Sequence, residues 1–484
     1  MSAPETRLTT GDPNLDRVLH GGIVEGSTVV ISGPPGAGKS ILAQQIVFAN
    51  ATSERPALMV ATFSEPQSKI VAHLSGFDFY TPDAFGDSVR PLALSDALRS
   101  PDGLASVVDR LTAEVVQTRP AVVVIDSAKA MTDAAASSPD LRSHVYELVA
   151  RLSHTGTTLL LVGEYDDDAI ATRAEFAVAD AILQLSNDAV GAADRRAFRV
   201  AKLRGSSFVS GRHSLSLTSK GVQVYPRLES IVQAAGVSPL PGRASLGVEG
   251  LDALVGGGLP AGDATLLMGP SGAGKTVLSL HFVATGVAAG EKTVYVSMEE
   301  SPDALMAKWR SFGMPLDDAL ADGRLVLHHA PITELDIDRL GDEVARLLRD
   351  RKPSRVVFDS LGELAVGAER EHRHPGYIWS LANLARRDGA SVIFTQETMA
   401  FGSEVGTRVG FSHLFHNVLF LRYLERPDRL SRALTVVKMR DSAHANQLVE
   451  LSIGPDGMHL DGTVAGATGL LGWTTLSVTD TGER

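Results

Sequence analysis

The sequence contains two glycine-rich stretches, Gly33-Pro34-Pro35-Gly36-Ala37-Gly38-Lys39-Ser40 and Gly269-Pro270-Ser271-Gly272-Ala273-Gly274-Lys275-Thr276. A short apolar run precedes each stretch and a run of helical character follows it, so both satisfy the pattern G-x-x-x-x-G-K-[ST] in its strand–loop–helix context. Glycines allow backbone amides to curve around phosphate oxygens, and the start of the following helix adds a partial positive charge. Two such matches in one chain predict two loops that bind the phosphates of ATP.

The polar side chains of these loops have distinct expected roles. We expect the two lysines to neutralise the β- and γ-phosphates, and we expect Ser40 and Thr276 to offer a hydroxyl group to Mg²⁺. The residues expected to bind ATP in the two loops are Gly33, Gly36, Ala37, Gly38, Lys39, Ser40, Ile41, Gly269, Gly272, Ala273, Gly274, Lys275, Thr276 and Val277.

The whole unit around each loop is repeated, not the loop alone. Lys39 and Lys275 lie 236 positions apart, and other matching residues keep nearly the same offset. Each repeat alternates apolar runs of strand length with helical runs, which is typical of a mostly parallel sheet flanked by helices. The sequence therefore predicts an α/β fold with two tandem domains, residues 1–230 and 243–462, joined by a linker containing glycine and proline and followed by a C-terminal tail at 463–484.

Composition excludes several kinds of chemistry. The 484-residue chain contains no cysteine, which excludes disulfides, zinc–thiolate sites and thiol nucleophiles. Its net charge of −12 gives no support for binding nucleic acid. The first residues lack the apolar segment of a signal peptide, and the apolar runs are too short to span a bilayer. We therefore expect a soluble, cytoplasmic protein without a membrane partner.

An aspartate ends an apolar strand in each repeat. Asp126 follows the run from Val122 to Ile125, and Asp359 follows the run from Val356 to Phe358. A carboxylate at the end of a strand beside a phosphate loop is placed to orient Mg²⁺ through the water shell of the ion. We expect both aspartates to act in this way, and the alternative is an exposed aspartate in a turn.

Hydrolysis of ATP also requires a carboxylate that orients or deprotonates the attacking water. Glu299 and Glu300 follow an apolar strand and are the candidates in the second repeat. When the repeats are aligned, Ser64 stands opposite the first glutamate of this pair and Glu65 stands opposite the second. The first repeat therefore offers only Glu65. The alternative is that these are acidic residues at the start of a helix.

Basic residues recur late in each repeat, on apolar strands. The two triplets are Lys202-Leu203-Arg204 and Lys438-Met439-Arg440, and Arg196 and Arg432 precede them. Basic side chains so far along the chain from the loop could reach a phosphate in a neighbouring subunit, as an arginine finger does. The alternative is surface charge on an edge strand.

Together these motifs resemble the KaiC family of circadian clock proteins, which belongs to the RecA-like ATPases. The resemblance extends from about Thr10 to Leu460 and is most specific in the duplicated loops, in Met298-Glu299-Glu300-Ser301-Pro302 and in the segment from Ser431 to Arg440. It implies two tandem RecA-like P-loop NTPase domains that bind and hydrolyse ATP with Mg²⁺. It also implies homohexamers that form with ATP, which lies between subunits, and an unidentified signalling protein as a partner.

The resemblance also assigns residues beyond the loops. Phe312 stands where the family often stacks an aromatic ring on adenine. The residues that would contact the ATP of a neighbouring subunit are Lys202, Leu203, Arg204, Lys438, Met439 and Arg440.

Family members that act in clocks phosphorylate themselves on an adjacent Ser-Thr pair in the second domain. In this sequence Ser412 is present, but His413 replaces the threonine, and Thr407 matches another hydroxyl residue upstream. The resemblance therefore leaves Ser/Thr autokinase activity open, with Ser412 and Thr407 as candidate phosphorylation sites. It does not support an ordered two-site cycle.

Two other classes of function stay open on the sequence alone. The first is a DNA-remodelling motor like RecA, RadA or DnaB, although no zinc ribbon, helicase accessory domain or basic stretch with interleaved aromatic residues supports it. The second is a nucleotide-gated scaffold that retains ATP without hydrolysing it. Phosphate release separates the scaffold from an ATPase, and salt-sensitive binding to single-stranded DNA would favour the motor.

Overall fold

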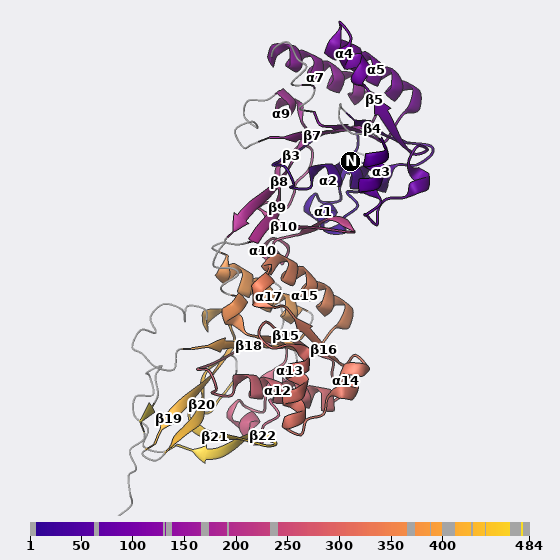
Figure 1. Ribbon diagram of the computed structural model, residues 1–484. Coiled ribbons are helices and arrows are strands. Elements are labelled where there is room, and N and C mark those ends of the chain that lie inside the picture. The colour runs from indigo at the N-terminus through magenta and orange to yellow at the C-terminus, as the bar shows by residue number, and fades with distance from the viewer. Residues whose placement is uncertain are drawn as a thin grey trace, which may run out of the picture. The chain divides into compact units, whose positions relative to one another are not determined.

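The chain folds into two compact units, residues 1–231 and 232–484, and each is described by itself (Figure 1). The computed structural model describes residues 6–61, 67–128, 131, 138–165, 174–190, 193–232, 241–364, 373–387, 389–398, 412–426, 429–440, 442–464 and 476–477. No helix in these ranges combines the length and the apolarity that a membrane crossing requires.

The first unit is built on a nine-stranded sheet. Its strands are β3 (Thr28–Gly33), β4 (Ala57–Ala61), β5 (Val89–Ala93), β6 (Val122–Asp126), β7 (Thr158–Glu164), β8 (Ala181–Val190), β9 (Ala193–Leu203), β10 (His213–Thr218) and β11 (Gly221–Tyr225). They lie in the order β11-β10-β9-β8-β3-β7-β6-β4-β5. The strands from β8 to β5 are parallel to their neighbours, whereas β9, β10 and β11 form an antiparallel extension.

Helices and a small ribbon complete the first unit. The helices are α1 (Pro13–Val18), α2 (Lys39–Asn50), α3 (Gln67–Leu74), η1 (Pro82–Ala84), α4 (Ser95–Arg99), α5 (Gly103–Thr118), α7 (Ser138–Ser153), α9 (Ala174–Val178) and α10 (Leu228–Ile231). The ribbon pairs β1 (Arg7–Leu8) with β2 (Ile23–Val24).

The second unit repeats this plan. Its large sheet contains β14 (Ala264–Gly269), β15 (Thr293–Ser297), β16 (Leu325–His329), β17 (Arg355–Asp359), β18 (Ser391–Glu397), β19 (Asn417–Glu425), β20 (Leu430–Met439), β21 (Leu448–Gly454) and β22 (Gly457–Thr463), and β23 (Leu476–Ser477) pairs with β19. The strand order is β16-β15-β17-β18-β14-β19-β20-β21-β22, parallel from β16 to β19 and antiparallel beyond it.

The second unit also contains a small two-stranded ribbon and helices. They are β12 (Arg243–Ala244), α11 (Leu251–Leu254), β13 (Leu259–Pro260), α12 (Lys275–Ala288), α13 (Pro302–Ser311), α14 (Asp317–Ala321), η2 (Ile332–Glu334), α15 (Ile337–Arg351), α17 (His374–Arg387) and η3 (Ser412–Leu414). Matched strand by strand, the two sheets have the same order, with β3 corresponding to β14 and β6 to β17. The predicted α/β fold with two tandem, mostly parallel sheets is confirmed.

The inner parallel strands are buried on both faces, which explains why they read as unbroken apolar runs. Val29 and Ile31 of β3 pack with α2 in one apolar core, whereas Val30 between them packs in a second core with α5 and α7. Helices therefore cover both faces of this sheet, and its end beside the loop stays open for a ligand.

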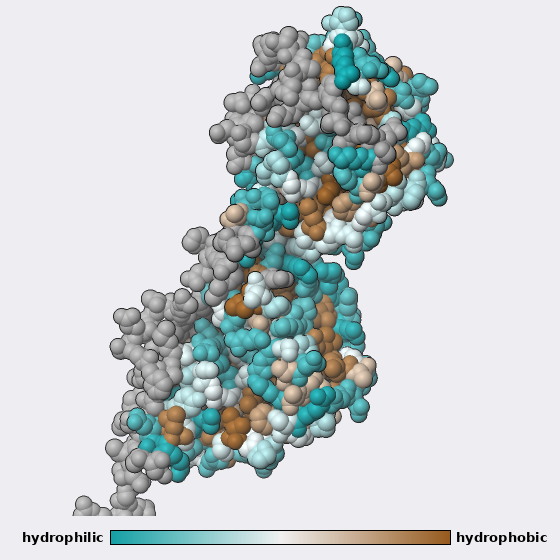
Figure 2. Space-filling model, in the orientation of Figure 1, coloured by the Kyte–Doolittle hydropathy of each residue, from teal (hydrophilic) through white to brown (hydrophobic). Residues whose placement is uncertain are grey.

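The described surface is mainly polar. On the face shown in Figure 2, hydrophilic residues cover most of each unit and the apolar residues form separate patches. The larger apolar side chains that remain exposed among the described residues are Val116, Tyr146, Leu320, Ile332, Leu430 and Val437.

Candidate nucleotide-binding sites

Both glycine-rich stretches form a tight loop between a central strand and the helix that follows it. Gly38 and Gly274 precede α2 and α12 with φ angles of 100° and 108°, in the left-handed region that favours glycine. A Cβ atom on Gly274 would lie 2.8 Å from the Cε atom of Met458, and one on Gly38 would lie 2.9 Å from Cδ2 of Leu217. The last glycine of each loop is therefore required by conformation and by packing.

The loop lysines are buried and bound to their own loops. The ammonium group of Lys275 donates to the carbonyl oxygens of Gly269 at 2.8 Å and Pro270 at 3.0 Å, and that of Lys39 donates to Pro34 at 2.8 Å. Burial lowers the pKa of both lysines, and nearby carboxylates oppose this effect. Each loop thus holds one cation against its own carbonyl oxygens, and a cation in a glycine-rich loop suits phosphate oxygens.

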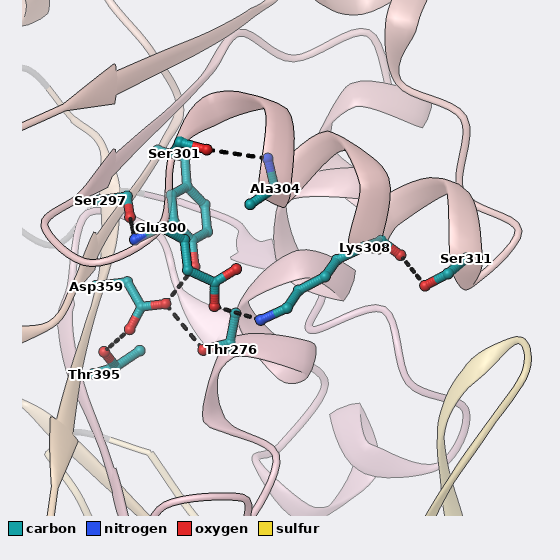
Figure 3. A network of polar contacts seen from close by, with 10 residues as sticks. Thr276, Ser297, Glu300, Ser301, Ala304, Lys308, Ser311, Asp359 and Thr395 are labelled. Carbon is teal, nitrogen blue, oxygen red and sulfur yellow. Dashed lines mark hydrogen bonds and ion pairs between the residues drawn. The ribbon is translucent and has the colours of Figure 1, made fainter.

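Asp359 lies at the centre of a network of hydroxyl groups in the second unit (Figure 3). Its Oδ2 atom accepts a hydrogen bond from Thr276 at 3.0 Å and one from Tyr295 at 2.6 Å, and its Oδ1 atom accepts one from Thr395. Burial, followed by the charge of Asp359, raises the pKa of Tyr295 well above its usual value, so the tyrosine is the donor. Hydroxyl and carboxylate oxygens are hard ligands, and this donor set fits Mg²⁺.

The corresponding aspartate of the first unit has different neighbours. The strand pairings place Met59 in the position of Tyr295, because Met59 lies beside Val124 as Tyr295 lies beside Val357. Val162 occupies the position of Thr395 in the same way, and both first-unit residues belong to its apolar core. Asp126 therefore cannot receive the tyrosine and threonine hydroxyl groups that bind Asp359.

Glu299 belongs to a group of carboxylates around Lys275 in the second unit. Partial removal from water and a hydrogen bond with Glu363 raise the pKa of Glu299 to about 7. Glu363 in turn accepts a hydrogen bond from the hydroxyl group of Ser360. Glu397 and Asp359 add further negative charge near Lys275. A triphosphate entering so acidic a site would need a divalent cation with it.

Glu300 is engaged differently from Glu299. Its carboxylate forms an ion pair with Lys308 of α13, and its backbone amide donates to the hydroxyl group of Ser297 at 3.0 Å (Figure 3). The hydroxyl group of Ser301 caps α13 by accepting a hydrogen bond from the amide of Ala304. Glu300 thus holds the start of α13 in place. Glu299, by contrast, bonds to Glu363 and belongs to the group of carboxylates around Lys275.

Glu65, the expected carboxylate of the first unit, lies outside the described residues, as does Ser64. The strands before these positions are β4 and β15, and Ala61 pairs with Asp126 of β6 as Ser297 pairs with Asp359 of β17. The two repeats therefore align here with an offset of 236 residues. Continuing this offset places Phe63 opposite Glu299, whereas an offset one residue shorter places Ser64 there. Both alignments leave the first unit without a carboxylate at that position.

The two Lys-x-Arg triplets lie at the opposite end of the sheet from the loop of their own unit. The amide of Arg440 donates to His416, whose own amide donates to Ala264, the first residue of β14. The loop begins after Gly269, at the other end of this strand, roughly 17 Å away at 3.3 Å per residue. In the first unit, the amide of Arg204 donates to Asp180, whose own amide donates to Thr28, the first residue of β3.

Arg196 and Arg432 differ from the triplets because each contacts the loop of its own unit. The Nε atom of Arg196 donates to the carbonyl oxygen of Gly36 at 3.2 Å, and that of Arg432 donates to Gly272 at 2.9 Å. The hydroxyl group of Tyr423 also donates to Ser271 at 3.0 Å. These arginines were expected to reach a neighbouring subunit, and in the single chain they brace their own loops.

The structure describes only some of the remaining candidate residues. Phe312 follows α13 and packs, half-buried, against the apolar core of the second unit. Ser412 begins η3, but its side chain, like all of Thr407, lies outside the described residues.

Tyr295, Thr395 and Glu363 belong to no motif in the sequence and were not predicted. Each has an apolar counterpart in the sequence of the first repeat, namely Met59, Val162 and Ala130. A comparison of the two repeats at every polar position on or shortly after a buried strand would have found them, because a buried polar group requires a partner.

Both units of the chain are similar to known proteins. A family model described as KaiC, among the ATPases, matches residues 8–229 and again residues 244–462. The circadian clock oscillator protein KaiC of Picosynechococcus sp. is 29% identical over 468 residues, which cover 93% of this chain and 89% of that protein. The circadian clock oscillator protein KaiC 1 of Synechocystis sp. is 28% identical over 466 residues, with 93% and 88% covered. That of Acaryochloris marina is 27% identical over 484 residues, with 97% and 91% covered.

Proposed function

The chain belongs to the KaiC family of ATPases, and on this premise we propose that it is a regulatory ATPase that binds Mg-ATP in both domains and assembles into homohexamers. We take the domains as residues 1–230 and 243–462. The observation that carries the proposal is the place of the Lys-x-Arg triplets, which lie at the far end of the sheet from their own loops. A phosphate partner for them would come from the next subunit of a ring, and ATP would then be bound between subunits.

The residues of the second domain would divide the chemistry of hydrolysis among them. Lys275 and the loop amides would bind the phosphates, Thr276 would bind Mg²⁺ directly, and Asp359 would orient its water shell. The metal ion, when bound, neutralises charge on the phosphate oxygens. Glu299 would accept the proton of the attacking water, and a carboxylate with a pKa of about 7 suits that step at neutral pH. Ser40 and Asp126 would bind the metal ion in the first domain.

The regulatory role includes an interaction with a signalling protein and would be exercised in the cytoplasm, in keeping with a sequence that has no cysteine. ATP bound at subunit interfaces links assembly to nucleotide state, because any ligand that binds only the assembly stabilises it. A partner that distinguishes the ring from the free subunit would then read the nucleotide state of the protein.

We expect the protein to elute as a hexamer from size-exclusion chromatography in saturating Mg-ATP and as smaller species without nucleotide. Arg204→Ala combined with Arg440→Ala should prevent assembly, because it removes the cations expected to bind ATP across the interface. Phosphate release measured on the same samples tests the ATPase. Lys220→Ala, on an exposed turn, is the matched control and should assemble normally. A particle that stays monomeric in saturating Mg-ATP would contradict the hexamer.

We also propose that the second domain phosphorylates its own hexamer on Ser412 or Thr407, as the family resemblance implies. Phosphopeptide mapping after incubation with Mg-ATP should then find phosphate on the segment from Gly406 to Ser412. Glu299→Gln, tested in parallel, shows whether any phosphate on this segment depends on the second site. If this segment carries no phosphate after prolonged incubation, the protein is an ATPase without autokinase activity.

A further inference from the structure

The hydroxyl group of Tyr295 lies inside the second site and belongs to none of the motifs by which that site was found. Tyr295 is 0% exposed, and its hydroxyl group donates to Oδ2 of Asp359 at 2.6 Å. A buried tyrosine hydroxyl needs a polar partner, and here the partner is the carboxylate expected to orient the metal ion.

The ring of Tyr295 is also held by packing. It packs edge-on against Trp309, with ring centroids 5.8 Å apart, and Trp309 is also 0% exposed. The indole Nε1 atom of Trp309 donates to the carbonyl oxygen of Leu280 at 3.2 Å, which belongs to α12, the helix that follows the phosphate loop. The position of the tyrosine hydroxyl is therefore fixed by packing on the same helix that carries Thr276.

Three hydroxyl donors occupy the carboxylate of Asp359. Thr276 and Tyr295 donate to Oδ2, and Thr395 donates to Oδ1. A carboxylate bound at both oxygens cannot rotate freely to coordinate a cation directly. Because the proton of the Thr276 hydroxyl points to Asp359, the lone pairs of its oxygen are directed away from that carboxylate and are available to a metal ion.

We infer that Tyr295 is a positioning residue for the metal ion of the second site: by fixing Asp359, it holds Thr276 in the orientation that binds Mg²⁺. This inference rests on the proposed function. The first domain has Met59 and Val162 in the places of Tyr295 and Thr395, and neither side chain can donate a hydrogen bond. The two sites should therefore bind the metal ion with different affinities, and the second should bind it more tightly.

The test is a titration with Mn²⁺, followed by electron paramagnetic resonance, in the presence of a non-hydrolysable ATP analogue. The full-length chain carries Lys39→Ala, so that the second site alone is observed. Tyr295→Phe keeps the ring on Trp309 and removes only the hydroxyl group, and it should weaken Mn²⁺ binding by roughly tenfold. Binding of the analogue in saturating Mg²⁺ should be unchanged, because the lysine and the loop amides are intact and excess metal ion fills the site. A mainly structural role for Tyr295 would alter both measurements.

Two further variants complete the experiment. Thr395→Val removes a donor from the other oxygen of Asp359 and should also weaken Mn²⁺ binding, so the inference stays testable if Tyr295→Phe fails to fold. Tyr146→Phe, at an exposed position on α7, is the matched control and should leave Mn²⁺ binding unchanged. Mn²⁺ affinities within twofold of the parent for both Tyr295→Phe and Thr395→Val would overturn the inference. If the parent binds no analogue at all, the proposed function fails instead.

Discussion

Lys275→Ala should abolish nucleotide binding in the second domain and leave the first domain loaded, so that the chain binds one nucleotide in place of two. Lys39→Ala should have the converse effect. Each lysine is almost fully buried and supplies the cation enclosed by its loop. Without it, the triphosphate enters a loop with no compensating charge, and in the second domain it also meets the four carboxylates around Lys275. We expect a loss of about 3 kcal/mol or more, at least a hundredfold in affinity.

Equilibrium binding of a fluorescent ATP analogue, with the stoichiometry determined for each variant, measures this effect. Lys220→Ala is again the control, because it removes one lysine from an exposed turn and should keep both sites. An unchanged stoichiometry in either loop variant would show that the loop concerned is not a nucleotide site. A loss of both sites from a single substitution would show that the two domains do not bind nucleotide independently.

Glu299→Gln should remove most of the phosphate release, by about 10²–10⁴-fold, because a positioned general base contributes that much to a hydrolysis rate. Glutamine keeps the size of the side chain and its hydrogen bond to Glu363 but cannot accept the proton of water. Glu65→Gln should change the rate little. The first domain has no carboxylate opposite Glu299 in either alignment of the repeats, and the sequence gives it Ala130 in the place of Glu363.

The measurement is steady-state phosphate release from the hexamer, together with the nucleotide that remains bound. We expect ATP to persist in the first domain and to hold the ring together while the second domain turns over. Glu300→Gln is the matched comparison in the second domain, since Glu300 pairs with Lys308 and should affect stability more than rate. If Glu65→Gln proves the more damaging change, the first domain is the main ATPase and the assignment is wrong.

The fold could be predicted from the sequence because its signals are local. The motif of each loop, such as residues 33–40, predicts a strand before it and a helix after it. The repeat of the motif then predicts two domains of the same fold. Asp126 and Asp359 could be predicted as well, because the residue that ends a buried strand beside the loop lies at the open end of the sheet. The family model matches residues 8–229 and 244–462 and so confirms the repeated fold.

The rest depends on which strands become neighbours, and that is not a local property. Tyr295, Thr395 and Asp359 come from β15, β18 and β17, and only the strand order brings them together. The sequence also did not separate Arg432 from Arg440, although they lie on and just after the same strand. The register of β20 places one at its own loop and the other at the far end of the sheet.

This separation along β20 gives the strand two ends with different attachments. Arg432, near its beginning, bonds to Gly272 of its own phosphate loop, and Lys438 and Arg440, at its end, would bond to the nucleotide of the next subunit. Because β20 pairs with β19 from Leu430 to Met439, it is one continuous element between these two ends. In a closed ring, each β20 would then connect two consecutive nucleotides, and the nucleotide state of one site would influence the other sites. In a free subunit, Lys438 and Arg440 bond to the carbonyl oxygens of Phe415 and His413 in their own chain, and the strand joins no second nucleotide.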